Sequence, residues 1–143
     1  MKKKAKSKKR LIVISGATAI GKTALSIKLA QHFNTEIVSA DSRQFYKELK
    51  IGAAPPSKKE LAKVAHHFIQ HLSVKEDYNV GRFEKEAIEK IEELFLKNEV
   101  VIMVGGSGLY IDAICNGLDV FPEIDQKIKQ AYITKYKSEG IKF

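Results

Sequence analysis

The sequence has little of what would place a protein outside the cell or in a membrane. Cys115 is the single cysteine among 143 residues, so the chain forms no internal disulfide bond and suits a reducing compartment. Crossing a bilayer takes roughly 20 consecutive apolar residues, and no stretch approaches that length. The apolar residues after the basic start, Leu11 to Ile14, are too few for a secretory signal. We therefore expect a cytoplasmic protein that does not contact membranes.

Acidic residues are absent from the start of the chain. Residues 1–10 hold seven of the 25 lysines and arginines, which leaves 18 basic against 17 acidic side chains for the rest. The net charge of +8 is therefore mostly local. A block of like charges repels itself, so we expect residues 1–10 to form a disordered basic tail. Alternatively, the tail follows an RNA backbone by counterion release.

A glycine-rich phosphate loop is the feature around which the rest of the sequence is organised. It has the pattern G-x-x-x-x-G-K-T and consists of Gly16, Ala17, Thr18, Ala19, Ile20, Gly21, Lys22 and Thr23. A short β-branched run precedes it and helical spacing follows, which is the context that makes the pattern a phosphate site. The glycines let backbone N–H groups point at the phosphates, and the helix adds the positive end of its dipole. The loop is typical of ATP-binding and other nucleotide-binding proteins, but it fits any linked diphosphate.

Three side chains near this loop are candidates for chemistry. Lys22 is long enough to reach a departing phosphate, and the Thr23 hydroxyl is placed to bind Mg²⁺. Asp41 follows an expected strand over residues 35–40, and the carboxyl ends of parallel strands form the ligand crevice of an α/β sheet. Its carboxylate can hold metal-bound water or accept a proton from a nucleophile. The alternative is that Asp41 caps a helix that starts at Ser42.

A second glycine pair separates the chain from common ATPases and GTPases. The unbroken apolar run over residues 100–104 predicts a central parallel strand that is buried on both faces. Phosphate-loop ATPases place an acidic Mg²⁺ partner near the end of a similar strand, where this chain has Gly105 and Gly106. We expect these glycines to let a substrate approach the backbone, and Ser107 to offer a hydrogen bond.

The remaining patterns complete an α/β prediction. We expect helices from the phosphate loop to Phe33, over residues 45–51, from a Ser57 capping box to about residue 64, and over an amphipathic segment that ends near Phe95. Residues 68–72 alternate like a strand, and the nearby His66, His67 and His71 are read as packed or hydrogen-bonded, with a metal site as the alternative. The predicted fold is a parallel sheet flanked by helices, as in P-loop NTPases, and it is incomplete because such domains usually have more strands.

Several motifs together resemble those of the tRNA dimethylallyltransferases. They are the phosphate loop, D-S-R-Q at residues 41–44, the Ile51-Gly52 turn, His66-His67, and G-G-S-G-L-Y at residues 105–110, and the resemblance covers residues 11 to about 129. It implies transfer of a dimethylallyl group from dimethylallyl diphosphate to the exocyclic amine of an adenosine adjacent to the anticodon in tRNA, with Mg²⁺. We expect the protein to act on these partners as a monomer.

The resemblance also implies roles for particular residues. Asp41 matches the family's catalytic aspartate, which orients the amine and accepts its proton, while Lys22 and a metal on Thr23 stabilise the departing diphosphate. Matching residues in the family contact the tRNA, and here they are Ser42, Arg43, Gln44, Ser107 and, where the family often has an arginine, Lys129. The chain departs from the family at Ala53 and Pro55, where a threonine and a lysine are common, which puts a polar contact from that turn in doubt.

The resemblance further implies that the sequence is part of a longer protein. Family members are about twice this length and carry a helical insertion that grips the anticodon stem. We assign residues 11–121 to a partial catalytic core and residues 122–143, with helical spacing from Ile124 to Tyr136, to the start of that insertion. The fragment alone should bind diphosphate weakly and hardly turn over.

Three other functions stay open at this point. A small-molecule kinase shares the phosphate loop and needs ATP as its donor. A prenyltransferase of free adenine nucleotides shares the chemistry but lacks the RNA-gripping insertion. An RNA-binding module needs neither donor and shows only salt-dependent affinity for tRNA.

Overall fold

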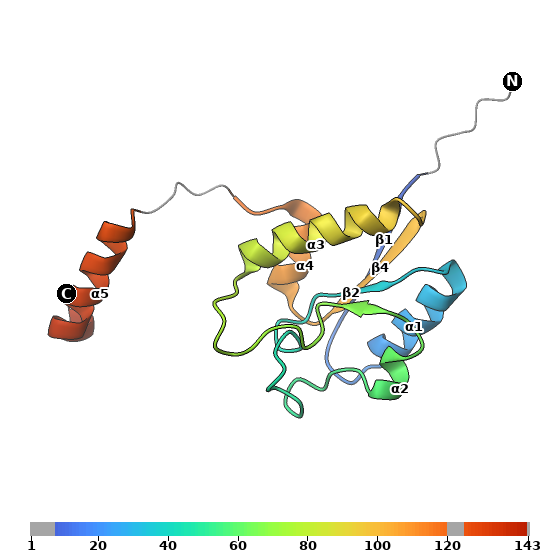
Figure 1. Ribbon diagram of the computed structural model, residues 1–143, viewed down its shortest axis with the longest axis horizontal. Helices are drawn as coiled ribbons and strands as arrows, with labels where there is room; N and C mark the ends of the chain where they lie inside the picture. The colour runs from blue at the N-terminus through green and yellow to red at the C-terminus, as the bar shows by residue number, and fades with distance from the viewer. Residues whose placement is uncertain (1–7, 120–124, 143) are drawn as a thin grey trace, which may run out of the picture.

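The computed structural model describes residues 8–119 and 125–142. Residues 8–119 form a parallel α/β sheet with its covering helices, and residues 125–142 are helical. The strands are β1 (Arg10–Ser15), β2 (Ile37–Ser39), β3 (His66–His67) and β4 (Val100–Gly105). The helices are α1 (Lys22–Phe33), α2 (Lys58–Leu61), α3 (Val80–Phe95), α4 (Gly108–Asn116), α5 (Gln126–Glu139) and the 3₁₀ helix η1 (Gly140–Lys142). Figure 1 labels β1, β2, β4 and the helices α1 to α5.

All strand pairs are parallel, and the order across the sheet is β1-β4-β2-β3. β4 lies between β1 and β2, with Ile102 opposite both Ile12 and Ile37, and every residue of β4 is buried. The predicted central strand is therefore confirmed. Because all strands run the same way, the ends of β1, β2 and β4 meet at one edge, where the phosphate loop also begins.

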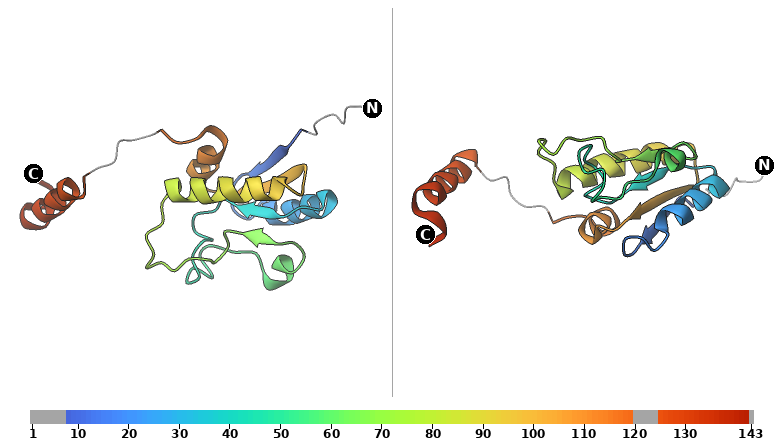
Figure 2. Two further views of the ribbon diagram at one scale, coloured as in Figure 1. Left: turned by 45° about the horizontal axis from the view of Figure 1, so that its top comes forward. Right: turned by 90° about the horizontal axis from the view of Figure 1, so that it is seen from below.

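Helices cover both faces of the sheet, as Figure 2 shows for α1 and α3. On one face, Ile27 and Ala30 of α1 pack against Ile37, Ile102 and their neighbours. On the other face, α3 packs against the sheet through four buried residues, and α4 packs against α3. The buried residues of α3 are Phe83, Ala87, Ile91 and Leu94. This two-sided burial explains why β4 reads as a continuous apolar run.

Short sequence patterns correctly predicted the end of α1 and the start of α2. α1 ends at Phe33, and Asn34 follows in the left-handed conformation with φ 50°. Ser57 and Glu60 form the expected capping box, although α2 ends at Leu61 rather than near residue 64. The strand β1 begins at Arg10, so that residue belongs to the sheet and not to a tail, whereas residues 1–7 lie outside the described part.

The helix expected over residues 45–51 is wrong. Phe45 is wholly buried, and its carbonyl accepts a hydrogen bond from the backbone N–H of Leu72, while Lys47 N–H donates to the Leu72 carbonyl. These long-range contacts replace the local ones of a helix. The same segment therefore runs as a series of turns over the end of the sheet.

The strand expected over residues 68–72 is also wrong. Pairing with β2 takes place two residues earlier, at His66 and His67. Phe68 and Gln70 have φ values of 62° and 47°, which an extended strand does not allow. The alternation of apolar and polar residues over 68–72 thus reflects how a bent segment packs, and not an extended strand.

The predicted helical spacing near the end of the chain is confirmed by α5. Figure 1 shows α5 and η1 apart from the sheet and from helices α1–α4. The predicted boundary at residue 122 falls outside the described residues. Among the described residues, none of the helices combines the length and the apolar character that crossing a bilayer requires.

Candidate functional site

The phosphate loop forms one wall of a cavity of about 290 Å³, which we call the loop cavity. The ends of β2 and β4, the turn before α2, α2 itself and β3 supply the other walls. Its lining includes the predicted residues Thr18, Ala19, Gly21, Lys22, Thr23, Asp41 and Gln44. Among the lining residues that the sequence analysis did not assign to the site are the ionisable Glu60 and His66.

The loop has the backbone that a phosphate cradle needs. Gly21 precedes α1 with φ 96°, and no side chain caps the first turn of the helix. The first backbone N–H groups of α1 therefore have no side-chain cap. They lie at the positive end of the helix dipole, where an anion is favoured. Ala19 also has a positive φ, 67°, although it is not glycine. Such a conformation in a non-glycine residue is typical of a functional turn.

Lys22 closes the loop with its own ammonium group. Its Nζ donates to the carbonyl oxygens of Gly16 and Ala17, at 2.8 and 2.6 Å. The positive charge is therefore held beside the loop, where an arriving phosphate oxygen can replace a carbonyl as the acceptor. Thr23 lines the same cavity, as its predicted role requires.

Asp41 lies where the strand order predicted, directly after β2. Its Oδ1 accepts a hydrogen bond from Arg43 N–H at 3.2 Å, and no helix begins at Ser42, so the helix-cap alternative is wrong. Its Oδ2 lies 3.5 Å from the position that a Cβ on Gly106 would take, and the Gly16 carbonyl is 3.7 Å from that position. The carboxylate thus lies close to Gly106, which is also close to the Gly16 carbonyl of the phosphate loop.

The Gly105 expectation needs a correction. A Cβ at residue 105 would lie 2.1 Å from the carbonyl oxygen of Ala40, so the close approach is between β4 and the chain's own backbone rather than a substrate. Gly106, by contrast, faces Asp41 as described above.

Replacing Gly105 by alanine should therefore destabilise the fold. We expect Gly105→Ala to lower the free energy of unfolding by about 3 kcal/mol, because overpacking against backbone is hard to relieve. Gly52→Ala is the matched control, since nothing lies within 4 Å of its Cβ position, and it should stay within about 0.5 kcal/mol of the parent. Urea unfolding measures both, and equal stability of the two variants would contradict this account.

A second hollow adjoins the loop cavity and contains most of the predicted tRNA-contacting residues. We call it the serine hollow, and it is lined by Thr18, Asp41, Ser42, Arg43, Gly106 and Ser107. Ser107 Oγ accepts from Ser42 N–H at 2.9 Å and donates to Ser42 Oγ at 3.0 Å. These two bonds join the turn that follows β2 to the residue that precedes α4. Thr18 and Asp41 line both spaces.

Two predicted tRNA-contacting residues lie elsewhere. Gln44 lines the loop cavity, where its Nε2 donates to the carbonyls of Ala53 and Ala54 at 3.2 Å each. Gln44 thus holds the turn that precedes α2, and that turn forms part of the cavity wall. Lys129 is exposed on α5, which lies apart from the sheet in Figure 1, and it lines neither space.

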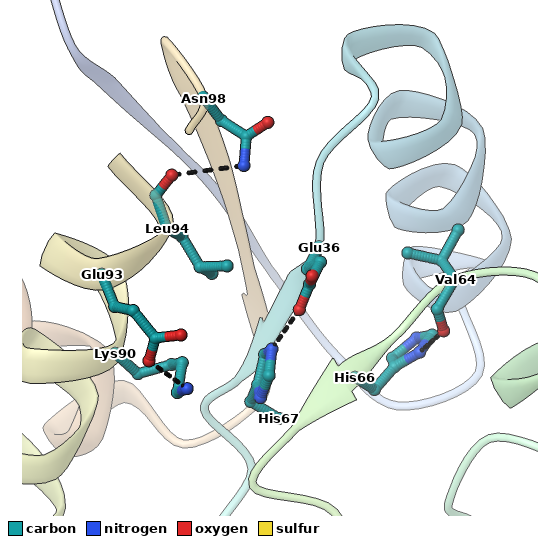
Figure 3. Close-up of polar contacts among 8 residues, drawn as sticks. All are labelled: Glu36, Val64, His66, His67, Lys90, Glu93, Leu94 and Asn98. Carbon is teal, nitrogen blue, oxygen red and sulfur yellow. Dashed lines mark hydrogen bonds and ion pairs between the residues drawn. The ribbon is translucent and has the colours of Figure 1, made fainter. Parts of the chain in front are cut away.

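The paired histidines of β3 have separate partners. His66 Nδ1 lies 2.8 Å from the Val64 carbonyl, and His67 Nε2 lies 2.6 Å from Glu36 Oε2 (Figure 3). Burial lowers the pKa of His66, while hydrogen bonds from Ser57 lower the pKa of the Glu60 carboxyl. Within residues 8–119 and 125–142 there is no group of three or more His, Cys, Asp or Glu able to hold a metal. The two histidines are hydrogen-bonded, as the sequence predicted.

His71 is packed rather than hydrogen-bonded. Its ring lies edge-on to Phe45, Phe68 and Tyr78, with centroids 5.6, 5.4 and 5.8 Å away. Both ring nitrogens are buried, and neither has a hydrogen-bond partner in the described part of the chain. Burial accordingly lowers the pKa of His71.

This burial predicts a loss of stability in mild acid. The unfolded chain binds a proton at His71 near pH 6.5, whereas the folded chain does so only at lower pH. The contribution of His71 to the free energy of unfolding is therefore complete above the unfolded pKa and decreases as the pH drops through it. The decrease for one proton cannot exceed about 1.4 kcal/mol per pH unit. Urea unfolding from pH 7.5 to 5.5 should show this fall, and His71→Phe should reduce it to the part contributed by His66. An unchanged pH slope in His71→Phe would contradict the assignment.

Comparisons with known proteins agree with this geometry. A family model described as IPP transferase matches residues 44–143. The tRNA dimethylallyltransferase of Flavobacterium johnsoniae is 60% identical over 94% of this chain and 44% of its own length. That of Christiangramia forsetii is 60% identical over 92% and 43%. The chain thus spans less than half the length of these relatives.

Solved structures show the same fold. The full-length tRNA isopentenylpyrophosphate transferase from Bacillus halodurans matches with a TM-score of 0.75 and 32% identity, over 93% of this chain and 44% of that protein. A eukaryotic dimethylallyltransferase acting on tRNA matches with a TM-score of 0.74 and 30% identity, over 92% and 36%. The predicted P-loop NTPase-like fold is confirmed.

Proposed function

Since the chain belongs to the IPP transferase family, we propose that it forms part of a tRNA dimethylallyltransferase. The protein would move a dimethylallyl group from dimethylallyl diphosphate to the exocyclic amine of an adenosine beside the anticodon. One observation carries this proposal: the loop cavity and the serine hollow adjoin, and Asp41 lines both. A carboxylate between a phosphate site and a second polar site suits a reaction in which a nucleophile displaces a diphosphate. Because tRNA is the acceptor, we place the reaction in the cytoplasm.

The loop cavity would hold the diphosphate. Backbone N–H groups at the start of α1 would receive phosphate oxygens, and Lys22 would exchange its bonds to Gly16 and Ala17 for bonds to the ligand. These fixed donors stabilise the negative charge that develops on the departing oxygen. The carbon–oxygen bond to the diphosphate breaks as the bond from the allylic carbon to the adenosine nitrogen forms.

The loop cavity also suits Mg²⁺. The described residues offer no three-residue metal cluster, but Thr23, Ser39 and Asp41, which have oxygen-bearing side chains, line the cavity. Mg²⁺ commonly takes only one or two protein oxygens and completes its shell with water and substrate phosphates, so this lining fits the ion, with Thr23 as its protein ligand. When bound, Mg²⁺ would supply charge neutralisation on the diphosphate.

Asp41 and the residues of the serine hollow would bind and orient the adenosine. The base must leave its stack to enter an enclosed site, and Ser42, Arg43 and Ser107 would bind the extruded nucleotide. Asp41 would orient the amine and accept its proton. An adenine amine is barely basic, so positioning contributes as much as proton removal. Lys129 on α5 would contact the tRNA farther from the reacting atoms.

The reaction is tested by isotope transfer with the full-length protein. Unmodified tRNA and radiolabelled dimethylallyl diphosphate are incubated with Mg²⁺, and label is measured in tRNA and in free adenine nucleotides. We expect label in tRNA alone. Consumption of ATP without label in tRNA would favour the kinase, and label in free nucleotides would favour the alternative prenyltransferase. Salt-dependent tRNA binding without transfer would leave only an RNA-binding module.

A further inference from the structure

His66 lines the loop cavity, and one of its ring nitrogens has no hydrogen-bond partner among the described residues. Its Nδ1 is bonded to the Val64 carbonyl, and because a carbonyl only accepts, the proton of the neutral ring is on Nδ1. The other nitrogen, Nε2, is buried and has no hydrogen-bond partner among the residues that the structure describes. Leaving a buried polar atom unpaired is costly, and such atoms are rare in folded proteins. Since His66 lines the loop cavity, a ligand that enters it and displaces the atoms covering Nε2 is the natural partner.

We propose that His66 is a diphosphate-binding residue, which takes a proton from solvent as the ligand enters and donates its Nε2–H to a phosphate oxygen. The proposal rests on the proposed function, because it needs a diphosphate in the loop cavity. It assigns a role to a side chain that the phosphate-loop motif does not include.

The charges around His66 favour this order of events. Without a ligand, burial and the neighbouring His67 lower the pKa of His66, and Glu60 acts in the opposite direction. Lys22 and Asp41 also line the loop cavity, one cationic and one anionic. A diphosphate adds several negative charges close to Nε2, and a nearby anion favours the protonated ring. Binding should therefore draw a proton from solution near neutral pH.

Glu60 does not compete for this role. Its Oε2 accepts from the backbone N–H and the hydroxyl of Ser57, at 2.8 and 2.7 Å, as part of the capping box of α2. These bonds lower the pKa of the carboxyl and keep it anionic, so it repels a diphosphate rather than binding it. The α2 capping box thus keeps Glu60 from acting as a donor, whereas the protonated His66 ring has an N–H to donate.

The chain offers matched variants for a test. In His66→Asn the side-chain amide lies near Nδ1, so the bond to Val64 is kept and nothing occupies the Nε2 position. In His66→Gln the amide reaches the Nε2 position and donates without titrating. His67→Gln is the control, because His67 contacts Glu36 (Figure 3) and does not line the loop cavity.

Isothermal titration calorimetry of the full-length protein with inorganic pyrophosphate, in buffers of different ionisation heat at pH 6 to 8.5, gives affinity and proton uptake together. We expect the parent and His67→Gln to take up a fraction of a proton. His66→Asn should lose this uptake and about 10- to 100-fold in affinity, the range for a charge-assisted hydrogen bond. His66→Gln should regain most of the affinity without uptake.

The outcomes separate this inference from the proposed function. Pyrophosphate binding by the parent without uptake that depends on His66 overturns the inference and leaves the transferase standing. Failure of the parent to bind pyrophosphate overturns both. Imidazole ¹⁵N spectra of the parent provide a test without variants, because the Nε2 signal should move to its protonated position when pyrophosphate is added, and an unmoved signal contradicts the role.

Discussion

Replacing Asp41 by asparagine is expected to lower kcat for dimethylallyl transfer to tRNA by about 10³-fold, within the range for loss of a general base. Asparagine keeps an oxygen that accepts from Arg43 N–H, so the turn after β2 should survive. It cannot accept the proton of the adenosine amine. The KM for dimethylallyl diphosphate should change by less than about threefold, because the loop that binds the diphosphate is untouched. Single-turnover incorporation of label into tRNA measures the chemical step.

Asp112→Asn is the control for this experiment. Asp112 is an exposed carboxylate on α4, where its Oδ1 accepts from Asn116, and it lines neither the loop cavity nor the serine hollow. Its replacement should leave kcat unchanged. If Asp41→Asn keeps its rate within about tenfold of the parent, Asp41 is not the proton acceptor.

Replacing Lys22 by methionine is expected to lower kcat/KM by 10²- to 10³-fold, roughly the effect of removing one preorganised donor from a developing anion. Methionine keeps much of the chain length but cannot donate, so the loop also loses the bonds from Nζ to Gly16 and Ala17. Pyrophosphate affinity should fall together with the rate, unlike in Asp41→Asn.

Lys28→Met provides the comparison, because Lys28 is exposed on the same helix, α1, and does not line the loop cavity. It should behave like the parent in both assays. Parent-like pyrophosphate affinity and transfer rate in Lys22→Met would show that the loop does not hold the leaving group.

The sequence predicted those parts of the fold that local patterns determine. The glycine-rich loop, the apolar run of β4 and the Asn34 helix end each have a cause within a few residues. The segments around Phe45 and Phe68 failed because their conformations depend on distant contacts. Phe45 is fixed in an aromatic cluster, and its carbonyl is bonded to Leu72. No periodicity over ten residues contains that information.

In the site too, the features set by local sequence were predictable and those set by distant contacts were not. Asp41 was predictable because the end of a parallel strand beside a phosphate loop is a known place for ligands. The Ser42–Ser107 bond joins residues that are 65 positions apart, and the close approach of Gly105 to Ala40 is equally remote in sequence. His66 was read as a packed or hydrogen-bonded histidine, with a metal site as the alternative, and was not placed at the cavity. Neighbouring residues on a strand face opposite sides of the sheet, so the two histidines of β3 have different surroundings, but the strand was expected at residues 68–72 and this signal was missed.

The most direct measurement of the central claim is a crystal structure of the full-length protein with an anticodon stem-loop and an unreactive diphosphate analogue. The account predicts phosphate oxygens against residues 16–23, the extruded adenosine beside Ser42 and Ser107, and its amine within about 3 Å of an Asp41 oxygen, as a proton acceptor requires. An adenosine bound away from Asp41, or a diphosphate outside the loop cavity, would contradict it.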